Sequence, residues 1–215
     1  IPFDRGGYFD LTPYDRGENV RREICLALEA MGISPESSHH EQGPGQNEID
    51  FRFADALTTA DDLLTFQSVV AAIAAQNGLF ASFRPKPIPD RSGSGLHVNL
   101  SLSKDGRNIF GDSRALSPTG EQFMAGILRR ARELSAFLCP TEESYLRLGA
   151  FEAPGFVSWS RENRSQLIRI PAASGDGVRM ELRSPDPMVN PYLALALIIS
   201  AGLEGVMEKV PLPPP

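Results

Sequence analysis

The chain has 215 residues, of which 41% are hydrophobic and 22% charged, a balance typical of a globular protein with one large domain and a substantial core. Its formal net charge of −6 argues against general affinity for nucleic acid, because binding to phosphate backbones requires a cationic surface. The longest apolar run, 192–203, is too short to span a bilayer and is interpreted as a buried helix.

Hydrophobic periodicity predicts four helices in chain order. Asp15 and Glu18 form a capping-box-like start for the first helix, and Ser117 and Asn190 stand where they would cap the last two. The predicted helices span 17–31, 58 or 59 to 78, 117–139 and 191 to about 207.

Four segments between these helices alternate between apolar and polar residues, as strands with one buried face do. They are 48–53, 96–102, the shorter 167–170, and 178–183. Each of the three longer strands is predicted to pack its apolar face and to present polar side chains on the other. Those polar sets are Glu48, Asp50 and Arg52, then His97, Asn99 and Ser101, then Arg179, Glu181 and Arg183.

Two kinds of polar residue gather in patterns that indicate chemistry. Hard divalent cations bind several carboxylate oxygens, with histidine as an additional ligand. Any one such residue is usually a solvated surface group, but together they point to metal binding; they are His39, His40, Glu41, Glu48, His97 and Glu181. Arginine suits carboxylates and phosphates because of its planar fork, and five arginines crowd into one stretch: Arg161, Arg164, Arg169, Arg179 and Arg183.

Neither a G-x-G-x-x-G nor a Walker A sequence is present, so a bound nucleotide would require another architecture. The two cysteines, Cys25 and Cys139, have neither the spacing of metal ligands nor the number of a disulfide framework. No basic segment followed by an apolar one opens the chain. We therefore expect a cytoplasmic location.

Six strings, read together, resemble the glutamine synthetase family (type I-like) in order and spacing, over nearly the whole chain. The resemblance implies an α+β fold, with a curved antiparallel sheet and helices packed on its outer face. It implies a single catalytic domain, 1–215, of a longer protein whose N-terminal β-grasp domain and first catalytic strand are absent here. The strings are 8–13 (YFDLTP), 39–48 (HHEQGPGQNE), 83–87 (FRPKP), 93–97 (GSGLH), 163–171 (NRSQLIRIP) and 179–193 (RMELRSPDPMVNPYL).

The resemblance also implies roles for individual residues. Glu41 and Glu48 would bind one metal ion, and His97 and Glu181 a second, as Mg²⁺ or Mn²⁺. Glutamate would be bound by Gly93, His97, Arg147 and Arg183. The nucleotide would be bound by Glu36, Ser101, Arg169 and Arg179. Arg164 would face phosphate as a catalytic residue, and Glu152 would be the catalytic carboxylate of a flap that takes a proton from ammonium.

The implied activity is ATP-dependent ligation of ammonia to glutamate through a γ-glutamyl phosphate, for glutamine biosynthesis and nitrogen assimilation. The implied partners are glutamate, ammonium, ATP and further copies of the full-length chain in a ring. Two alternatives stay open, a γ-glutamyl amine or polyamine ligase and a non-catalytic relative. The 215 residues alone are expected to have little or no activity.

Three positions depart from the family pattern. Asn99 stands where a second histidine is usual, and Ser92 stands where asparagine usually precedes the Gly-Ser-Gly turn. Arg147 lies one residue closer to Glu152 than expected. These departures affect the neighbourhood of nucleotide and glutamate, and hence the expected affinity and choice of substrate.

Overall fold

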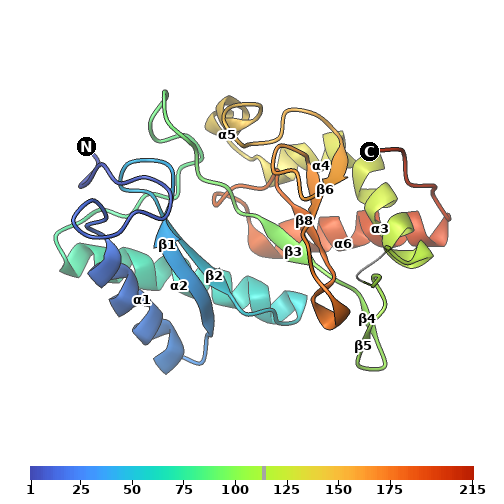
Figure 1. Cartoon of the computed structure of the whole chain (residues 1–215), viewed down its shortest axis with the longest axis horizontal. Coiled ribbons are helices and arrows are strands. Elements are labelled where there is room, and N and C mark those ends of the chain that lie inside the picture. Colours follow the sequence, from blue (N-terminus) through green and yellow to red (C-terminus); the bar gives the residue numbers. More distant parts are fainter. Residues whose placement is uncertain (113–114) are drawn as a thin grey trace. The chain divides into compact units, whose positions relative to one another are not determined.

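The computed structural model describes residues 1–112 and 115–215 as two compact units (Figure 1). The N-terminal unit comprises Ile1–Phe83 with Pro87–Gly93, and the C-terminal unit comprises Arg84–Lys86 with Ser94–Pro215. The single domain over 1–215 stays a prediction.

The N-terminal unit is a two-stranded antiparallel hairpin accompanied by two helices. His39 pairs with Glu48 and His40 with Asn47 in the hairpin register. Its elements are α1 (Glu18–Ala30), β1 (Pro35–His40), β2 (Asn47–Phe51) and α2 (Ala56–Gln76). The core of this unit consists of Ile24, Leu28 and Ile33, with Ile49, Phe51, Phe66 and other apolar side chains packed against them.

The apolar face predicted for 48–53 is confirmed at Ile49 and Phe51, which pack against this core, but Phe53 lies beyond the strand and is 91% exposed. The strand β1 was not predicted. Its sequence, PESSHH, lacks the alternation of a half-buried strand.

The prediction that Asp15 and Glu18 cap the start of α1 is wrong. The N-cap residue is Gly17, and no side chain caps the helix. Asp15 instead accepts a hydrogen bond from the Gly17 N–H (2.8 Å) and forms an ion pair with Arg21. The second helix begins earlier than predicted, because Asp55 caps it by accepting from the N–H groups of Leu57 and Thr58, each at 3.1 Å.

The C-terminal unit is built on a four-stranded sheet in the order β3-β8-β7-β6. The pairs β3/β8 and β8/β7 are antiparallel, whereas β6 and β7 run parallel. The strands and the 3₁₀ turn of this unit are β3 (Val98–Leu100), β4 (Ser103–Lys104), β5 (Arg107–Asn108), β6 (Trp159–Arg161), β7 (Ile168–Ile170), β8 (Met180–Leu182) and Gly175–Gly177. Its helices are α3 (Pro118–Arg129), α4 (Ala131–Leu138), α5 (Glu142–Arg147) and α6 (Pro191–Met207).

Helices cover one face of this sheet. Met180 and Leu182 of β8 share one buried core with Phe123 of α3, Leu134 of α4 and Ile198 of α6. Period-two alternation turns the neighbouring residues of β8 to the opposite face. The predicted α+β arrangement and the apolar faces of 96–102 and 178–183 are confirmed, with a parallel β6/β7 pair as an addition.

The helix predicted for 117–139 is two helices. The chain leaves helical geometry at Arg130 (φ −95°, ψ 6°), which ends α3 and precedes α4. Leu134 and Leu138 of α4 are buried in the same core as α3, so the apolar spacing continues across the break and hides it. The last predicted helix is confirmed as α6, capped by Asn190, which accepts from the Leu193 N–H at 3.1 Å.

Glycines allow α3 and α6 to approach closely. A Cβ atom on Gly126 would lie 2.2 Å from the carbonyl oxygen of Ala201 and 2.8 Å from the Cα atom of Gly205. A side chain at Gly205 would meet the backbone of α3 at the same distance, 2.2 Å from the Gln122 oxygen. The two helices therefore touch backbone to backbone.

The C-terminal tail lies along the same unit. Trp159, the only tryptophan of the sequence, donates a hydrogen bond from Nε1 to the carbonyl oxygen of Pro213 at 2.8 Å. Leu212 packs against the core, and Trp159 does so as a half-buried side chain. Among the helices of 1–112 and 115–215, none has both the length and the apolar character needed to cross a membrane.

Candidate functional site

In the N-terminal unit, the β1–β2 hairpin brings Glu41 and Glu48 to the same histidine. Nε2 of His39 lies 3.0 Å from Oε1 of Glu41 and 3.9 Å from Oε1 of Glu48. The pairing of His39 with Glu48 across the hairpin explains this approach, because directly paired residues lie side by side. The two carboxylates predicted to share a metal ion are thus neighbours.

Two aromatic rings bury the histidine between these carboxylates. Phe9 stacks on His39 with ring centroids 4.3 Å apart, and Tyr8 meets it edge-on at 5.7 Å. The His39 side chain is 10% exposed, and its Nδ1 atom is buried without a hydrogen-bond partner. Its position between Glu41 and Glu48 marks a place where positive charge is favourable.

The donor set of this hairpin suits a hard cation. Both glutamates offer carboxylate oxygens, which Mg²⁺ and Mn²⁺ prefer. His39, Glu48 and Asp50 also bring one potential ligand atom each to within 4.8 Å of one another. The residues present therefore fit a divalent cation at the end of the hairpin.

In the C-terminal unit, Glu181 is the centre of a charged cluster on the sheet face opposite the helices. Its Oε1 atom lies 3.4 Å from Nδ1 of His97. Its Oε2 atom lies 2.5 Å from Nε of Arg169 and 3.1 Å from an Arg183 nitrogen. One oxygen thus faces two guanidinium groups, and the other faces a histidine that can bind a cation with it.

The surroundings of His97 favour its neutral form. Burial, followed by the positive charges of Arg183, Arg147, Arg169 and Arg164, lowers the pKa of His97 well below its usual value. A neutral imidazole keeps the lone pair that a metal ligand needs. Arg164 lies in the exposed loop between β6 and β7 and belongs to this positive environment.

Arg147 is buried, with a residue exposure of 2%, and its charge acts on His97. Its guanidinium donates to the main-chain oxygens of Arg183 and Ser184, both at 2.9 Å. A Cβ atom on Gly95 would lie 2.8 Å from Arg147 and 2.9 Å from Nε2 of His97, so a larger residue there would displace these two side chains. In this structure Arg147 holds the end of β8, and its contact with glutamate stays a prediction.

Asn99, one of the departures from the family pattern, has a defined partner. Its side-chain oxygen accepts a hydrogen bond from Nε of Arg179 at 3.0 Å. Arg179 also donates to the carbonyl oxygen of Gly177 at 3.1 Å. Asn99 thus orients the arginine predicted to contact the nucleotide, while Ser101 is exposed just after β3.

Glu152 lies in an exposed loop that follows α5. The loop is closed by a hydrogen bond from the Gly149 N–H to the Pro154 oxygen at 3.2 Å. Phe151 adopts a left-handed backbone conformation (φ 56°), and the ammonium group of Lys86 lies 4.6 Å from the centre of its ring. A bulky residue with positive φ is uncommon outside constrained turns.

Two further predicted residues, Glu36 and Gly93, belong to the N-terminal unit. Glu36 is exposed near the start of β1, five residues before Glu41 at the end of the hairpin. The carbonyl oxygen of Gly93 accepts from Nε2 of Gln46 at 2.9 Å, and Ser92 donates to the side-chain oxygen of Gln42 at 2.9 Å. Gly93 and Ser92 are thereby tied to the turn that joins Glu41 to Glu48.

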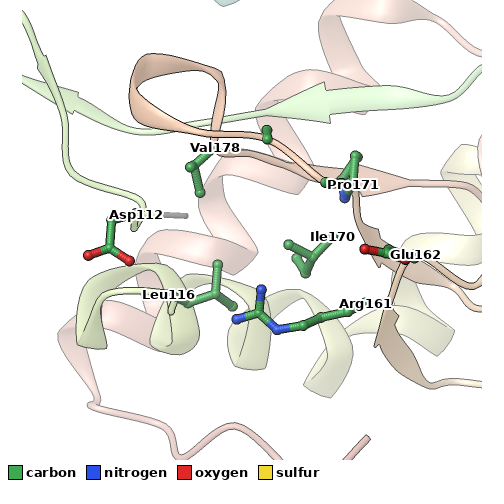
Figure 2. A pocket seen from close by; sticks show the side chains of 9 residues that line it. Asp112, Leu116, Arg161, Glu162, Ile170, Pro171 and Val178 are labelled. Atoms are coloured by element: carbon green, nitrogen blue, oxygen red, sulfur yellow. The ribbon is translucent and has the colours of Figure 1, made fainter. Parts of the chain in front are cut away.

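A cavity of about 150 Å³ lies elsewhere in the C-terminal unit (Figure 2). Arg161 and Glu162 supply polar side chains to its lining, and Leu116, Ile170 and Val178 supply apolar ones. None of the described residues that line it belongs to the predicted site. Its described lining comes from Asp112, Leu116, Val178 and the C-terminal ends of β6 and β7.

Sequence reasoning missed a role for His39, although the residue was counted among the potential ligands. The pairing of His39 with Glu48 could have indicated this role. That pairing can be inferred from the sequence only if β1 is recognised as a strand. The two clusters define a class of protein: a carboxylate pair suited to a divalent cation, together with an arginine-rich sheet face suited to anionic substrates.

Comparisons with known proteins agree with that class. The family model described as "Glutamine synthetase, catalytic domain" matches residues 2–215, and the chain belongs to this family. It is 54% identical over 211 residues to the glutamine synthetase of Clostridium saccharobutylicum, covering 96% of this chain and 48% of that protein. It is 53% identical over 216 residues to the glutamine synthetase of Thermus thermophilus, covering 99% of this chain and 48% of that protein.

Solved structures agree in fold. The cryo-EM structure of Plasmodium falciparum glutamine synthetase superposes with a TM-score of 0.90 at 36% identity, covering 96% of this chain and 41% of that one. A structure titled "GmaS/ADP complex-Conformation 1" superposes with a TM-score of 0.89 at 36% identity, covering 100% of this chain and 52% of that one. The chain thus spans about half the length of the curated relatives it matches.

Proposed function

We propose that the protein to which this chain belongs joins ammonia to glutamate at the expense of ATP, through γ-glutamyl phosphate, to give glutamine. The observation that carries this proposal is the identity of 50–54% with curated glutamine synthetases over nearly the whole chain. The charged cluster around Glu181 supports it, because the reaction brings together carboxylate and phosphate groups that repel one another.

In the proposed reaction, arginine side chains meet the negative charge that develops as the γ-carboxylate of glutamate takes the terminal phosphoryl group of ATP. Arg164 and Arg169 would face that phosphate, and Arg183 would bind glutamate. Such charges act best when they are fixed in advance. The contacts of Arg169 and Arg183 with Glu181 hold both guanidinium groups in place before any substrate arrives.

Glu41 and Glu48 would bind one divalent cation, Mg²⁺ or Mn²⁺, and His97 and Glu181 a second. When bound, the cations neutralise charge on the phosphate oxygens and so ease attack by a carboxylate. The remaining nucleotide contacts in the proposal are Glu36, Ser101 and Arg179, the last held by Asn99.

Glu152 would complete the reaction. The acyl phosphate has a good leaving group, so water must be excluded from it until ammonia attacks. An exposed loop that carries a carboxylate can cover the site and accept a proton from ammonium, which generates the nucleophile. The loop geometry around Phe151 and Lys86 supports a defined position for Glu152.

The test is phosphate release from ATP by the full-length protein with glutamate and Mg²⁺, with and without ammonia. Release that depends on ammonia and falls strongly in Glu152→Ala is the expected result. Glu121→Ala is the matched control, because Glu121 is exposed on α3, on the helical side of the sheet. Release only with methylamine or a polyamine would contradict ammonia as the substrate, and no release with any amine would contradict ligase activity.

Homo-oligomeric assembly in the cytoplasm belongs to the same proposal. Three phenylalanines, Phe53, Phe80 and Phe156, are each at least 85% exposed. Interfaces between chains are enriched in aromatic side chains relative to the rest of the surface. Light scattering of the full-length protein measures the assembly directly, and a monomeric mass would contradict it.

A further inference from the structure

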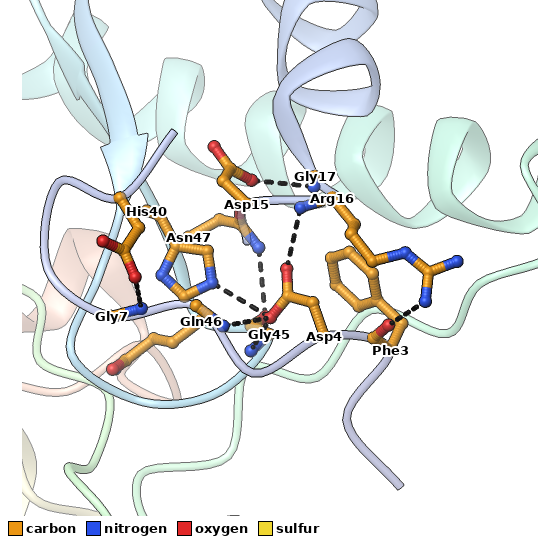
Figure 3. A network of polar contacts seen from close by, with 12 residues as sticks. Phe3, Asp4, Gly7, Asp15, Arg16, Gly17, His40, Gly45, Gln46 and Asn47 are labelled. Atoms are coloured by element: carbon orange, nitrogen blue, oxygen red, sulfur yellow. Dashed lines mark hydrogen bonds and ion pairs between the residues drawn. The ribbon is translucent and has the colours of Figure 1, made fainter. Parts of the chain in front are cut away.

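A buried carboxylate near the start of the chain is fully engaged by donors from three segments (Figure 3). The side chain of Asp4 is 0% exposed. One of its oxygens accepts from the Gly45 N–H at 2.7 Å and from Nε2 of His40 at 3.0 Å, and more weakly from the Gly6 N–H at 3.4 Å. The other accepts from the Arg16 N–H at 3.1 Å.

His40 carries this connection to the backbone of a predicted metal ligand. Its ring is fully buried, and Nδ1 lies 2.6 Å from the carbonyl oxygen of Glu41. Both ring nitrogens face oxygen atoms, so the ring bridges the Asp4 carboxylate and the backbone of Glu41. Gly6 gives the ring its space, because a Cβ atom there would lie 2.8 Å from Nε2.

These contacts hold the turn that separates Glu41 from Glu48 at two points. Through His40, Asp4 reaches Glu41 at one end, and through the Gly45 N–H it reaches the middle of the turn. The turn itself closes with a hydrogen bond from the Glu41 N–H to the Gln46 oxygen at 2.8 Å. The spacing between Glu41 and Glu48 is therefore set by the buried contact between Asp4 and His40 and by the Asp4–Gly45 hydrogen bond.

We propose that Asp4 and His40 are positioning residues, which hold Glu41 and Glu48 at the spacing that a divalent cation requires. This inference rests on the proposed function, because it assigns those two glutamates to metal binding. Outer contacts of this kind usually change metal affinity by about 10- to 100-fold when they are lost.

The same residues do not form a metal site of their own. Asp4, Asp15 and His40 bring potential ligand atoms to within 4.8 Å of one another. However, both oxygens of Asp15 face Arg21, at 3.1 and 2.6 Å, and the oxygens of Asp4 are directed at N–H donors. A cation there would replace bonds that are already made, so the cluster acts as a support for the hairpin.

The test measures Mn²⁺ binding to the full-length protein without substrates, by titration with detection of free Mn²⁺ by electron paramagnetic resonance. Asp4→Asn removes the charge but keeps the shape, and Gly6→Ala displaces the His40 ring without removing a polar group. We expect each variant to bind Mn²⁺ about 10-fold more weakly at the site that Glu41→Gln abolishes. Hydrogen exchange should rise in residues 41–47 and stay unchanged in α1.

Asp10→Asn is the matched control, because Asp10 belongs to the same segment but accepts only from the Gly7 N–H among its described hydrogen bonds. It should bind Mn²⁺ as the wild-type protein does. Wild-type affinity in both Asp4→Asn and Gly6→Ala would overturn the positioning role, as would global loss of protection in both. If Glu41→Gln leaves Mn²⁺ binding unchanged, the metal assignment fails first, and the positioning role fails with it.

Discussion

The ion pair between Asp15 and Arg21 provides the sharpest test of how burial sets the strength of an interaction. Oδ2 of Asp15 lies 2.6 Å from a nitrogen of Arg21, and their side chains are 1% and 8% exposed. Asp15→Asn removes the carboxylate charge and leaves the Arg21 charge buried among neutral partners, which include the side-chain oxygen of Asn47 at 2.5 Å. Removing one partner from a buried ion pair costs about 3–5 kcal/mol, and we expect a loss in this range.

The pair between Arg130 and Glu204 is the control, because it has the same distance and a different environment. Its closest atoms are also 2.6 Å apart, but the side chains are 44% and 27% exposed. Water and salt screen such a pair, so Glu204→Gln should cost far less than Asp15→Asn. Hydrogen exchange of α1 peptides for Asp15, and of α6 peptides for Glu204, measures the free energy of opening at each place.

The effect of Asp15 also depends on pH with a definite sign. Burial alone would raise its pKa, but the hydrogen bonds from Arg21 and the Gly17 N–H, with the charge of Arg21, outweigh burial and lower the pKa. The carboxylate therefore stabilises the fold fully above its unfolded pKa of about 4, and this contribution is lost as the pH falls through the lower folded value. The difference between wild type and Asp15→Asn should shrink below about pH 4. Equal, small losses in Asp15→Asn and Glu204→Gln at neutral pH would refute the reasoning.

Three further predictions concern the C-terminal unit. Gly126→Ala gains about 1 kcal/mol in helix propensity but drives a methyl group into the backbone of α6, so we expect a net loss of about 1–3 kcal/mol in urea unfolding. Ser117→Ala removes the hydroxyl that caps α3, which accepts from the Gly120 N–H at 3.0 Å, and should cost about 1 kcal/mol in the same assay. Lys86→Met removes the cation from the ring of Phe151 and should speed hydrogen exchange in residues 148–154.

Each of these has a control and a contrary outcome. Ser200→Ala, at an exposed position of α6, is the control for the stability measurements and should leave the free energy of unfolding within about 0.5 kcal/mol of wild type. If Gly126→Ala stabilises the protein, α3 and α6 are not in backbone contact. Unchanged unfolding of Ser117→Ala would show that water replaces the cap. Unchanged exchange in residues 148–154 of Lys86→Met would show that other contacts fix the loop.

Sequence signals predicted those helix ends that depend only on residues within one helical turn. Asn190 followed by Pro191 marks the start of α6, because both residues act within one helical turn. Asp15 was misinterpreted as part of a cap because its actual partner, Arg21, lies in the helix that it was thought to begin. The break at Arg130 was also missed, since the apolar spacing continues across it.

In the site, too, contacts between residues close in sequence could be predicted, whereas contacts between distant residues could not. The carboxylates Glu41 and Glu48 could be named from the sequence, and their neighbourhood follows from one hairpin register. The link from Asp4 to His40 joins residues 36 positions apart, and periodicity carries no information about such a contact. The roles assigned to the site residues depend on the resemblance to a family, whereas their contacts come from the structure.

The single tryptophan makes the two units optically distinguishable. Because Trp159 is the only indole in these 215 residues and is held by the Pro213 oxygen, its fluorescence responds to undocking of the tail and to unfolding of the C-terminal unit. The N-terminal unit contains no such fluorophore, so circular dichroism would register its unfolding while the tryptophan emission stays constant. A denaturation curve recorded with both signals would therefore reveal whether the carboxylate hairpin melts independently of the arginine-rich sheet.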